Sequence, residues 1–67
     1  METRIAPGRA CVYRYDGPFA RVTPTRPVEM LLPNVSVGAP GNEHDHSVVR
    51  FESGERMVVP NATLSEA

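Results

Sequence analysis

The sequence predicts a single small all-β domain, made of four to five short, strongly bent antiparallel strands. A chain of 67 residues is long enough for one domain only. Seven prolines and five glycines are spread along it, and the longest stretch free of both is 42–53. An ordinary amphipathic helix of about 11 residues therefore has little room. Short runs of β-branched and aromatic residues lie between these turn residues, which is typical of strands.

In the first half of the chain, the residue pattern predicts three strands. The run RACVYRY, 9–15, carries apolar side chains on both faces. Asp-Gly-Pro at 16–18 is a strong turn signal, and FARVT, 19–23, then alternates as a second strand. The prolines of 24–27 should interrupt pairing, because proline cannot donate to a strand ladder. The run VEMLL, 28–32, resumes as a third strand.

In the second half, a long loop is followed by a hairpin. Residues 33–45 contain two prolines and two glycines and predict a mobile loop, which in so small a domain is often functional. Strands are expected at 46–52 and 55–59, joined at Gly54, since glycine tolerates the positive φ of a tight turn. Residues 61–64 fit one 3₁₀ turn whose Leu64 closes the open end of the sheet.

The stretch VVRFESGERMVVPNATL, 48–64, resembles the closing hairpin of Src-homology-3-like (SH3-like) small barrels, including Tudor-type and related bacterial barrels. In that family a strand ending in an aromatic and an acidic residue turns at glycine, and the return strand leads into a short turn closed by leucine. The resemblance implies an SH3-like barrel over 9–64. The residue pattern predicts a flexible tail at 1–8 and a frayed end at 65–67. Closing the sheet would also remove exposed strand edges.

The end of the hairpin has a second, narrower resemblance. The run MVVPNATL, 57–64, is similar in layout to the end of the plasmid-borne type II dihydrofolate reductases, which are tetramers of one such barrel around a single active-site pore. That family has Val-Gln-Ile-Tyr before the proline, where this chain has Arg56-Met57-Val58-Val59, and this chain contains no lysine. The resemblance implies a shared fold, and the missing glutamine, tyrosine and lysine argue against the reductase activity.

The charge pattern narrows the choice of partners. A net charge of −1 disfavours simple electrostatic capture of nucleic acid. Residues 1–32 carry a balance of +2 and residues 33–67 a balance of −3, so the two halves could pair within the fold or between subunits. All seven basic residues are arginine, which codon bias in a GC-rich bacterial genome explains more simply than selection for anion binding.

The single cysteine bears on stability. Cys11 has no partner for an internal disulfide, and its apolar and aromatic neighbours favour a small core residue over a nucleophile. A domain this small buries a marginal core. We therefore expect self-association, as a homo-oligomer, to add stability.

The expected compartment is the cytoplasm. No apolar run approaches the roughly 20 residues of a membrane span, and METRIAPGRA, 1–10, is too polar for a signal peptide. No membrane partner is expected. The chain has no glycine-rich phosphate loop or other cofactor fingerprint, so no cofactor is expected either.

One cluster of candidate metal ligands lies in the predicted loop. His44 and His46 are two residues apart, so on an extended segment both imidazoles would face the same way, with Glu43 and Asp45 nearby. A zinc site normally needs three or four protein ligands, and a third convincing ligand is missing. A solvated loop is the simpler interpretation, and ligands from a second subunit are the alternative.

The first hairpin is the preferred binding surface. Tyr13, Arg14, Tyr15 and Arg21 gather aromatic rings and guanidinium groups there, and small barrels bind peptides or single-stranded nucleic acid with such surfaces. The rings could equally serve the core. The sequence thus predicts a non-catalytic binding module for a protein, peptide or nucleic acid. An oligomeric enzyme with a site built across subunits, and a metal-responsive loop protein, are the alternatives.

Overall fold

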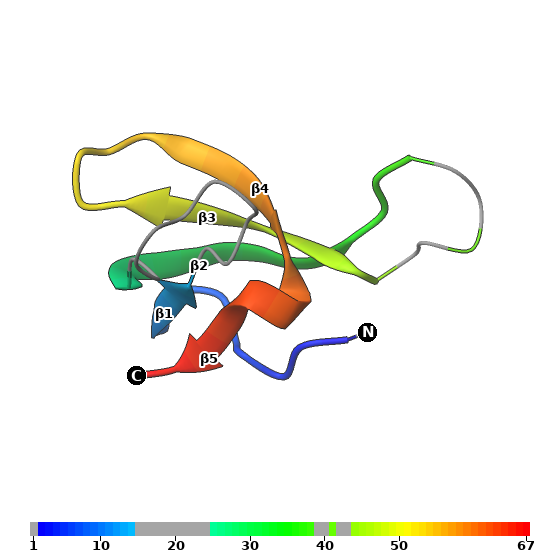
Figure 1. Cartoon of the computed structure of the whole chain (residues 1–67), viewed down its shortest axis with the longest axis horizontal. Coiled ribbons are helices and arrows are strands. Elements are labelled where there is room, and N and C mark those ends of the chain that lie inside the picture. The colour runs from blue at the N-terminus through cyan, green and yellow to red at the C-terminus, as the bar shows by residue number, and fades with distance from the viewer. Residues whose placement is uncertain (1, 15–24, 39–40, 42–43) are drawn as a thin grey trace.

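A computed structural model of the chain describes residues 2–14, 25–38, 41 and 44–67. Its five strands form one antiparallel sheet in the order β4-β3-β2-β1-β5 (Figure 1). The elements are β1 (Ala10–Arg14), β2 (Thr25–Val35), β3 (His46–Phe51), β4 (Arg56–Pro60), a 3₁₀ turn (Asn61–Thr63) and β5 (Leu64–Glu66). The described ranges contain no α-helix, and hence none that could span a membrane. The predicted all-β class is confirmed.

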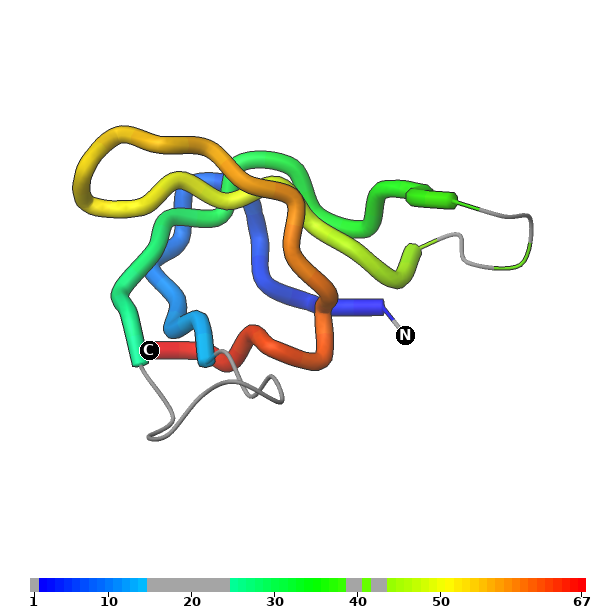
Figure 2. Tube along the Cα trace, turned by 45° about the horizontal axis from the view of Figure 1, so that its top comes forward, coloured from blue at the N-terminus to red at the C-terminus, as the bar shows by residue number. Residues whose placement is uncertain are grey.

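The sheet is curled rather than flat. Figure 2 shows the chain path bending so that β1 and β5 turn away from the hairpin of β3 and β4. Among the described residues, β4 and β5 are the two edges of the sheet. What is observed is therefore a curled five-stranded sheet, with a 3₁₀ turn leading into its last strand.

The long strand β2 joins the two halves of the sheet. Its beginning pairs with β1, where Arg14 lies opposite Thr25, and its end pairs with β3, where Val35 lies opposite His46. The predicted interruption at 24–27 is wrong from Thr25 onward, since Pro27 lies within β2 opposite Val12.

The physical reason lies in the pairing of β2. In the described part of the sheet, residues 25–27 have a ladder partner on the β1 side only, and this one-sided position is where a strand tolerates proline. Pro33 also belongs to β2, although 33–45 was predicted as loop. It falls between Leu32 and Val35, where the register with β3 shifts.

The hairpin of β3 and β4 follows the prediction closely. The backbone N–H of Phe51 donates to the Glu55 carbonyl at 2.8 Å, and the N–H of Gly54 donates to the Phe51 carbonyl at 2.9 Å. Gly54 has φ of 90°, which glycine adopts without steric cost. The 3₁₀ turn is also confirmed, and Leu64 packs against the core.

The two chain ends are part of the fold. The N–H of Gly8 donates to the Met30 carbonyl at 2.7 Å, and the N–H of Met30 donates to the Arg9 carbonyl at 3.0 Å. Ser65 and Glu66 pair with β1 in β5. A flexible tail was predicted at 1–8 and a frayed end at 65–67; in the structure, backbone hydrogen bonds, the pairing of β5 and the buried side chain of Ile5 connect these segments to the sheet.

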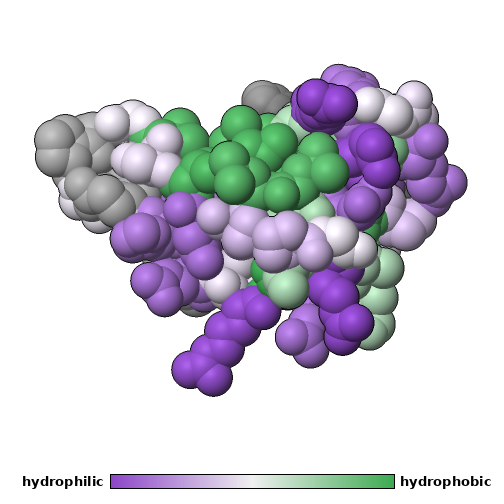
Figure 3. All heavy atoms as spheres, turned by 180° about the vertical axis from the view of Figure 1, so that it is seen from behind, coloured by the Kyte–Doolittle hydropathy of each residue, from purple (hydrophilic) through white to green (hydrophobic). Residues whose placement is uncertain are grey.

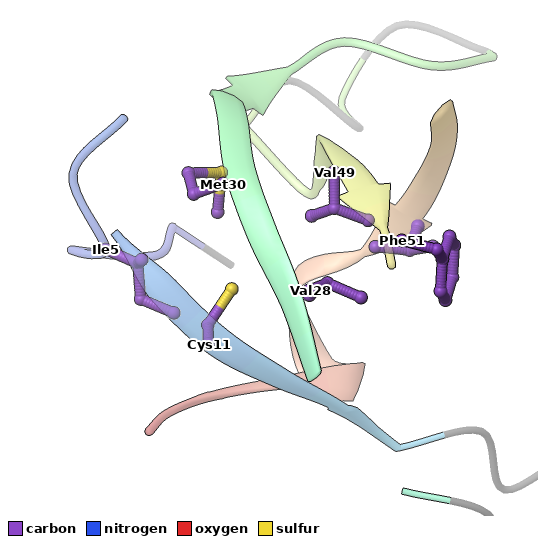
Figure 4. Packing of buried hydrophobic residues seen from close by; sticks show 7 residues of the cluster. Ile5, Cys11, Val28, Met30, Val49 and Phe51 are labelled. Carbon is purple, nitrogen blue, oxygen red and sulfur yellow. The ribbon is translucent and has the colours of Figure 1, made fainter. Parts of the chain in front are cut away.

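The core is small and lies inside the curl. Figure 4 shows side chains from the N-terminal segment, β1, β2 and β3 pointing toward one another. The buried hydrophobic residues are Ile5, Cys11, Val28, Met30, Val49, Phe51 and Val59. Burial raises the pKa of the Cys11 thiol. Cys11 is therefore a core residue, and its thiolate, the reactive form, is disfavoured.

Candidate functional site

An aromatic pair marks one end of the sheet. The rings of Tyr13 and Phe51 meet edge to face, with centroids 5.6 Å apart and an interplanar angle of 87°. Tyr13 is half-buried against the core, and Arg26 lies directly opposite it in the ladder. An edge-to-face pair contributes about 0.5–1.5 kcal/mol beyond its burial. The pair therefore holds both rings in place at the start of β2.

Beside this pair lies a hollow, which we call the Phe51 groove. It has a volume of about 310 Å³ and is lined by Arg26, Pro27, Phe51, Glu52 and Ser53. The groove combines an aromatic ring and a proline with one basic and one acidic side chain. Apolar surface with a few charged groups at its margin is the usual make-up of a ligand site.

A second hollow continues the groove toward the charged side of the sheet. Its volume is about 500 Å³, and it shares Pro27, Phe51 and Glu52 with the groove. Its lining also includes Glu29 and Arg50, whose side chains form an exposed ion pair. Together the two hollows give the strand end a path that an extended ligand could follow.

The structure places only part of the predicted ligand surface. Tyr13 lies beside the groove through its contact with Phe51, and Arg14 is exposed at the end of β1. Tyr15 and Arg21, together with the predicted turn at 16–18 and strand at 19–23, lie outside the described residues. Tyr13 is thus the predicted ligand residue that the structure associates with a hollow.

Sequence reasoning missed the groove residues on β2 and β3. Phe51 was predicted only as part of the strand at 46–52, and Pro27 as part of an interruption of pairing. The usable signal was the register: Val28 lies opposite Phe51, so Pro27 and the turn after Phe51 come together at the same end of the sheet. Such a register depends on which strands pair, and a single sequence does not state that.

The two histidines do not share an extended segment. His44 has φ of 67°, in the left-handed region, whereas His46 is the first residue of β3. The expectation that their imidazoles face the same way on an extended backbone is therefore wrong. Within the described ranges, no group of three or more His, Cys, Asp or Glu side chains could hold a metal ion. Glu43 lies outside those ranges, so metal binding stays a prediction.

A ring of hydrogen bonds supports the base of the loop between β2 and β3. The backbone N–H of Asn34 donates to Ser47 Oγ at 3.2 Å, Ser47 Oγ donates to Asn61 Oδ1 at 2.5 Å, and Asn61 Nδ2 donates to Asn34 Oδ1 at 3.0 Å. We call these three residues the polar ring. Ser47 and Asn61 are buried, and satisfying buried polar groups in this way avoids a large desolvation cost.

The polar ring also ties in neighbouring segments. The side-chain amide of Asn34 bonds to the backbone of Thr3: the Thr3 N–H donates to Asn34 Oδ1 at 2.8 Å, and Asn34 Nδ2 donates to the Thr3 carbonyl at 3.0 Å. Asn61 Nδ2 donates to the His44 carbonyl at 2.7 Å. Its role is therefore structural: it joins the N-terminal segment, β2, β3 and the 3₁₀ turn. The unusual backbone of Asn34, with φ of 58°, is explained by these contacts, since asparagine tolerates this region better than most residues.

The side of β2, β3 and β4 that faces away from the core also carries apolar side chains. Val48 of β3 lies opposite Leu32 of β2 and Val58 of β4, so the three share one face. We call this row the outer apolar row. Leu32 is 56 % and Val58 48 % exposed, and Val48 is half-buried. Seen from behind, the molecule has a continuous hydrophobic area (Figure 3).

Known proteins add no assignment. No protein family, characterised protein or solved structure matches this chain. The Phe51 groove and the outer apolar row are therefore the features from which a function can be inferred.

Proposed function

We propose that this protein is a small non-catalytic binding module with an SH3-like barrel fold. The strand order supports the fold: a long curled β2 joins both halves of the sheet, and a 3₁₀ turn leads from β4 into β5. The partly buried Leu64 just after that turn also agrees with the resemblance of the closing hairpin to such barrels.

The Phe51 groove is the observation that carries the binding function. Its aromatic ring and proline offer apolar surface, while Arg26 and Glu52 offer one charge of each sign. Mixed charges fit a peptide better than a nucleic acid, whose phosphates need a predominantly basic surface. The ligand we propose is an extended peptide with an apolar residue for the groove and polar neighbours for Arg26 and Glu52.

The non-catalytic assignment is supported by the state of Cys11. This residue is the only thiol in the chain, and it is 1 % exposed, with a raised pKa. A nucleophilic cysteine is typically exposed and has a lowered pKa. Cys11 has the opposite properties, so it serves packing.

Peptide selection tests this function. A displayed random-peptide library is selected on the immobilised chain, and the affinity of the selected peptides is measured by titration calorimetry. We expect Arg26→Ala and Glu52→Ala each to weaken binding by roughly five- to tenfold, the typical effect of one charged contact. Arg9→Ala, an exposed arginine outside the groove, is the matched control. Selected peptides that bind both groove variants as tightly as the unaltered chain would overturn the assignment of the groove.

Self-association is the second part of the proposal. Exposed hydrophobic side chains on a 7.3 kDa domain with a small core support it, since burying them would add stability that the monomer lacks. Sedimentation equilibrium over a wide concentration range tests it directly. We expect a reversible increase in mean mass with concentration, and a constant monomer mass would contradict this part.

A further inference from the structure

We propose that the outer face of β2, β3 and β4 is the interface of a two-fold symmetric dimer, whose occupant is a second copy of this chain. This inference rests on the self-association proposed above and specifies its surface and geometry. Its starting point is the outer apolar row, in which Leu32, Val48 and Val58 stand side by side across three strands. Isolated exposed hydrophobic residues are normal on a protein surface, but contiguous ones mark interaction sites.

A charged row borders the apolar row. Glu29 of β2 lies opposite Arg50 of β3, which lies opposite Arg56 of β4. Read from β2 to β4, the row is negative, positive, positive. Glu29 and Arg50 form an ion pair, whereas Arg56 has no ion-pair partner within the described part of the chain. Arg50 and Arg56 are like charges directly opposite each other, which is unfavourable in a sheet. A carboxylate from a second molecule could offset this repulsion by pairing with Arg56.

A third row lies on the other side of the apolar row. Val35 of β2 lies opposite His46 of β3, which lies opposite Pro60 of β4. The outer face therefore consists of a charged row, an apolar row and a mostly apolar row. The rows on the two sides of the apolar row differ in polarity. Different orientations of a second copy would therefore place different groups against the charged row.

Two orientations of a two-fold axis bring the apolar row onto itself. An axis parallel to β3 lays β2 of one protomer over β4 of its partner, and each row meets the same row of the other copy. Leu32 then meets the partner's Val58, and Glu29 meets the partner's Arg56. An axis perpendicular to β3 instead lays the charged row over the row of Val35 and Pro60, so that charges are buried against apolar groups.

The axis parallel to β3 also brings the two copies of Arg50 together at the centre of the charged row, where each stays paired with Glu29 of its own chain. The contact of Glu29 with the partner's Arg56 at both ends of the row nevertheless favours this axis. It gives Arg56 a carboxylate in each half of the dimer, and Glu29 then lies between Arg50 of its own chain and Arg56 of the partner copy. Burying a charge without a partner is costly, which disfavours the perpendicular arrangement. At the centre of the face, each Val48 lies next to the same residue of the other protomer, as an isologous interface requires.

The size of the face predicts a weak dimer. Three strands about 4.8 Å apart, with three rows about 6.7 Å apart, cover roughly 300 Å² of flat sheet per copy. Side-chain relief and the neighbouring turns enlarge this area, but it stays at the low end of protein interfaces. We therefore expect a dissociation constant in the micromolar range, so that the equilibrium is measurable in both directions.

Single substitutions in the outer apolar row test the surface. Leu32→Asp and Val58→Asp should each weaken the dimer at least tenfold in sedimentation equilibrium, because each places an unpaired carboxylate in the interface. Val37→Asp is the matched control: Val37 is also an exposed hydrophobic residue, 39 % accessible, but it lies in the loop after β2. Circular dichroism checks that the variants keep the fold, and Leu32→Ser replaces Leu32→Asp if that variant does not.

A charge exchange tests the orientation. Glu29→Arg and Arg56→Glu should each weaken the dimer, and the double variant should recover most of the affinity, because the two rows would again carry complementary charges. Only the axis parallel to β3 predicts this recovery. A double variant that stays as weak as the single variants would overturn this orientation.

Cross-linking tests the centre of the interface. Val48→Cys should be joined to the partner copy by a short bis-maleimide cross-linker, because facing sheets lie about 10 Å apart, too far for a direct disulfide. Val37→Cys should not be joined in this way, and the buried Cys11 should not compete. The possible failures are distinct. A dimer that survives both Leu32→Asp and Val58→Asp overturns this interface and leaves self-association intact, whereas a chain that is monomeric at every concentration overturns both.

Discussion

The inner and outer faces of β2, β3 and β4 have nearly the same chemistry and different surroundings. On the inner face, Met30 and Val49 are fully buried. On the outer face, Leu32 and Val58 are about half exposed. On β3 the two faces are one residue apart, at Val48 and Val49, because successive side chains point to opposite faces. On β2, Met30 and Leu32 are two residues apart and reach opposite faces because the register with β3 shifts between them. Hydrophobicity alone therefore does not tell which face a small sheet uses for folding and which remains available for a partner.

Replacing one side chain on each face by alanine tests whether the inner face contributes more to stability than the outer face. We expect Met30→Ala to cost about 2–5 kcal/mol of unfolding free energy, because it leaves a cavity in the core. Leu32→Ala, its neighbour on the outer face, should cost less than about 1 kcal/mol in the monomer. Urea denaturation at low protein concentration measures both. Equal losses would mean that the outer face is as well packed as the core.

The polar ring provides the next largest effect. Asn61→Ala removes a buried side chain that bonds to Ser47, Asn34 and the His44 carbonyl. The Ser47 hydroxyl loses its acceptor and the His44 carbonyl loses this donor. We expect the free energy of unfolding to fall by about 1–3 kcal/mol. Thr63→Ala is the control, since its hydroxyl donates one exposed hydrogen bond, to the Pro60 carbonyl. If both variants unfold at the same urea concentration, the ring does not support the fold as described.

Cys11 tests the burial of the inner face without altering it. Because burial raises the pKa of the thiol, its reaction with a thiol reagent at neutral pH should be at least about tenfold slower in the folded chain than in urea. The raised pKa also makes the stability of the fold depend on pH. As the pH rises, the Cys11 thiol of the unfolded chain loses its proton before the buried thiol of the folded chain does.

The contribution of the buried, protonated Cys11 thiol to the free energy of unfolding is fully present below the ordinary thiol pKa of 9.0, which applies to the unfolded chain. It falls as the pH rises above that value. Denaturation of Cys11→Ala over the same pH range is the control, because this variant lacks the titrating thiol. Rapid labelling of the folded chain would contradict the burial of Cys11.

The smallest effect is expected for the exposed ion pair. Glu29 and Arg50 have side chains 38 % and 44 % exposed, and such pairs contribute about 0–1 kcal/mol. Glu29→Gln should therefore hardly change the melting temperature of the monomer, although it should weaken the proposed dimer. The matched measurement is the melting temperature at low and high salt. If Glu29→Gln lowered the melting temperature of the monomer strongly, and less so at high salt, the ion pair would stabilise the fold itself.

Local features of the fold could be predicted from the sequence. The turn at Gly54 and the 3₁₀ turn after Pro60 depend on residues within a few positions of each other, and both were predicted where they occur. The strands of the closing hairpin were predicted to within a residue for the same reason. The core position of Cys11 followed from its apolar neighbours in sequence.

Features that depend on distant segments could not be predicted. The extension of β2 through Pro27 depends on the absence of a neighbour on one side of that residue in the described sheet. The polar ring joins residues 34, 47 and 61, which in the sequence belong to a loop, a strand and a turn. Of the candidate ligand residues, Tyr13 was placed beside the groove, but its partner Phe51 was not anticipated.

The sequence by itself determined the all-β class, the closing hairpin and the absence of an internal disulfide, because each follows from composition or from neighbouring residues. Only the tertiary structure decided the strand order, the packing of the N-terminal segment through Ile5, and the position of the Phe51 groove. It alone placed Leu32, Val48 and Val58 in one row. The physical reason is register: cross-strand contacts are set by how distant segments align, and alternation within one strand does not encode that alignment.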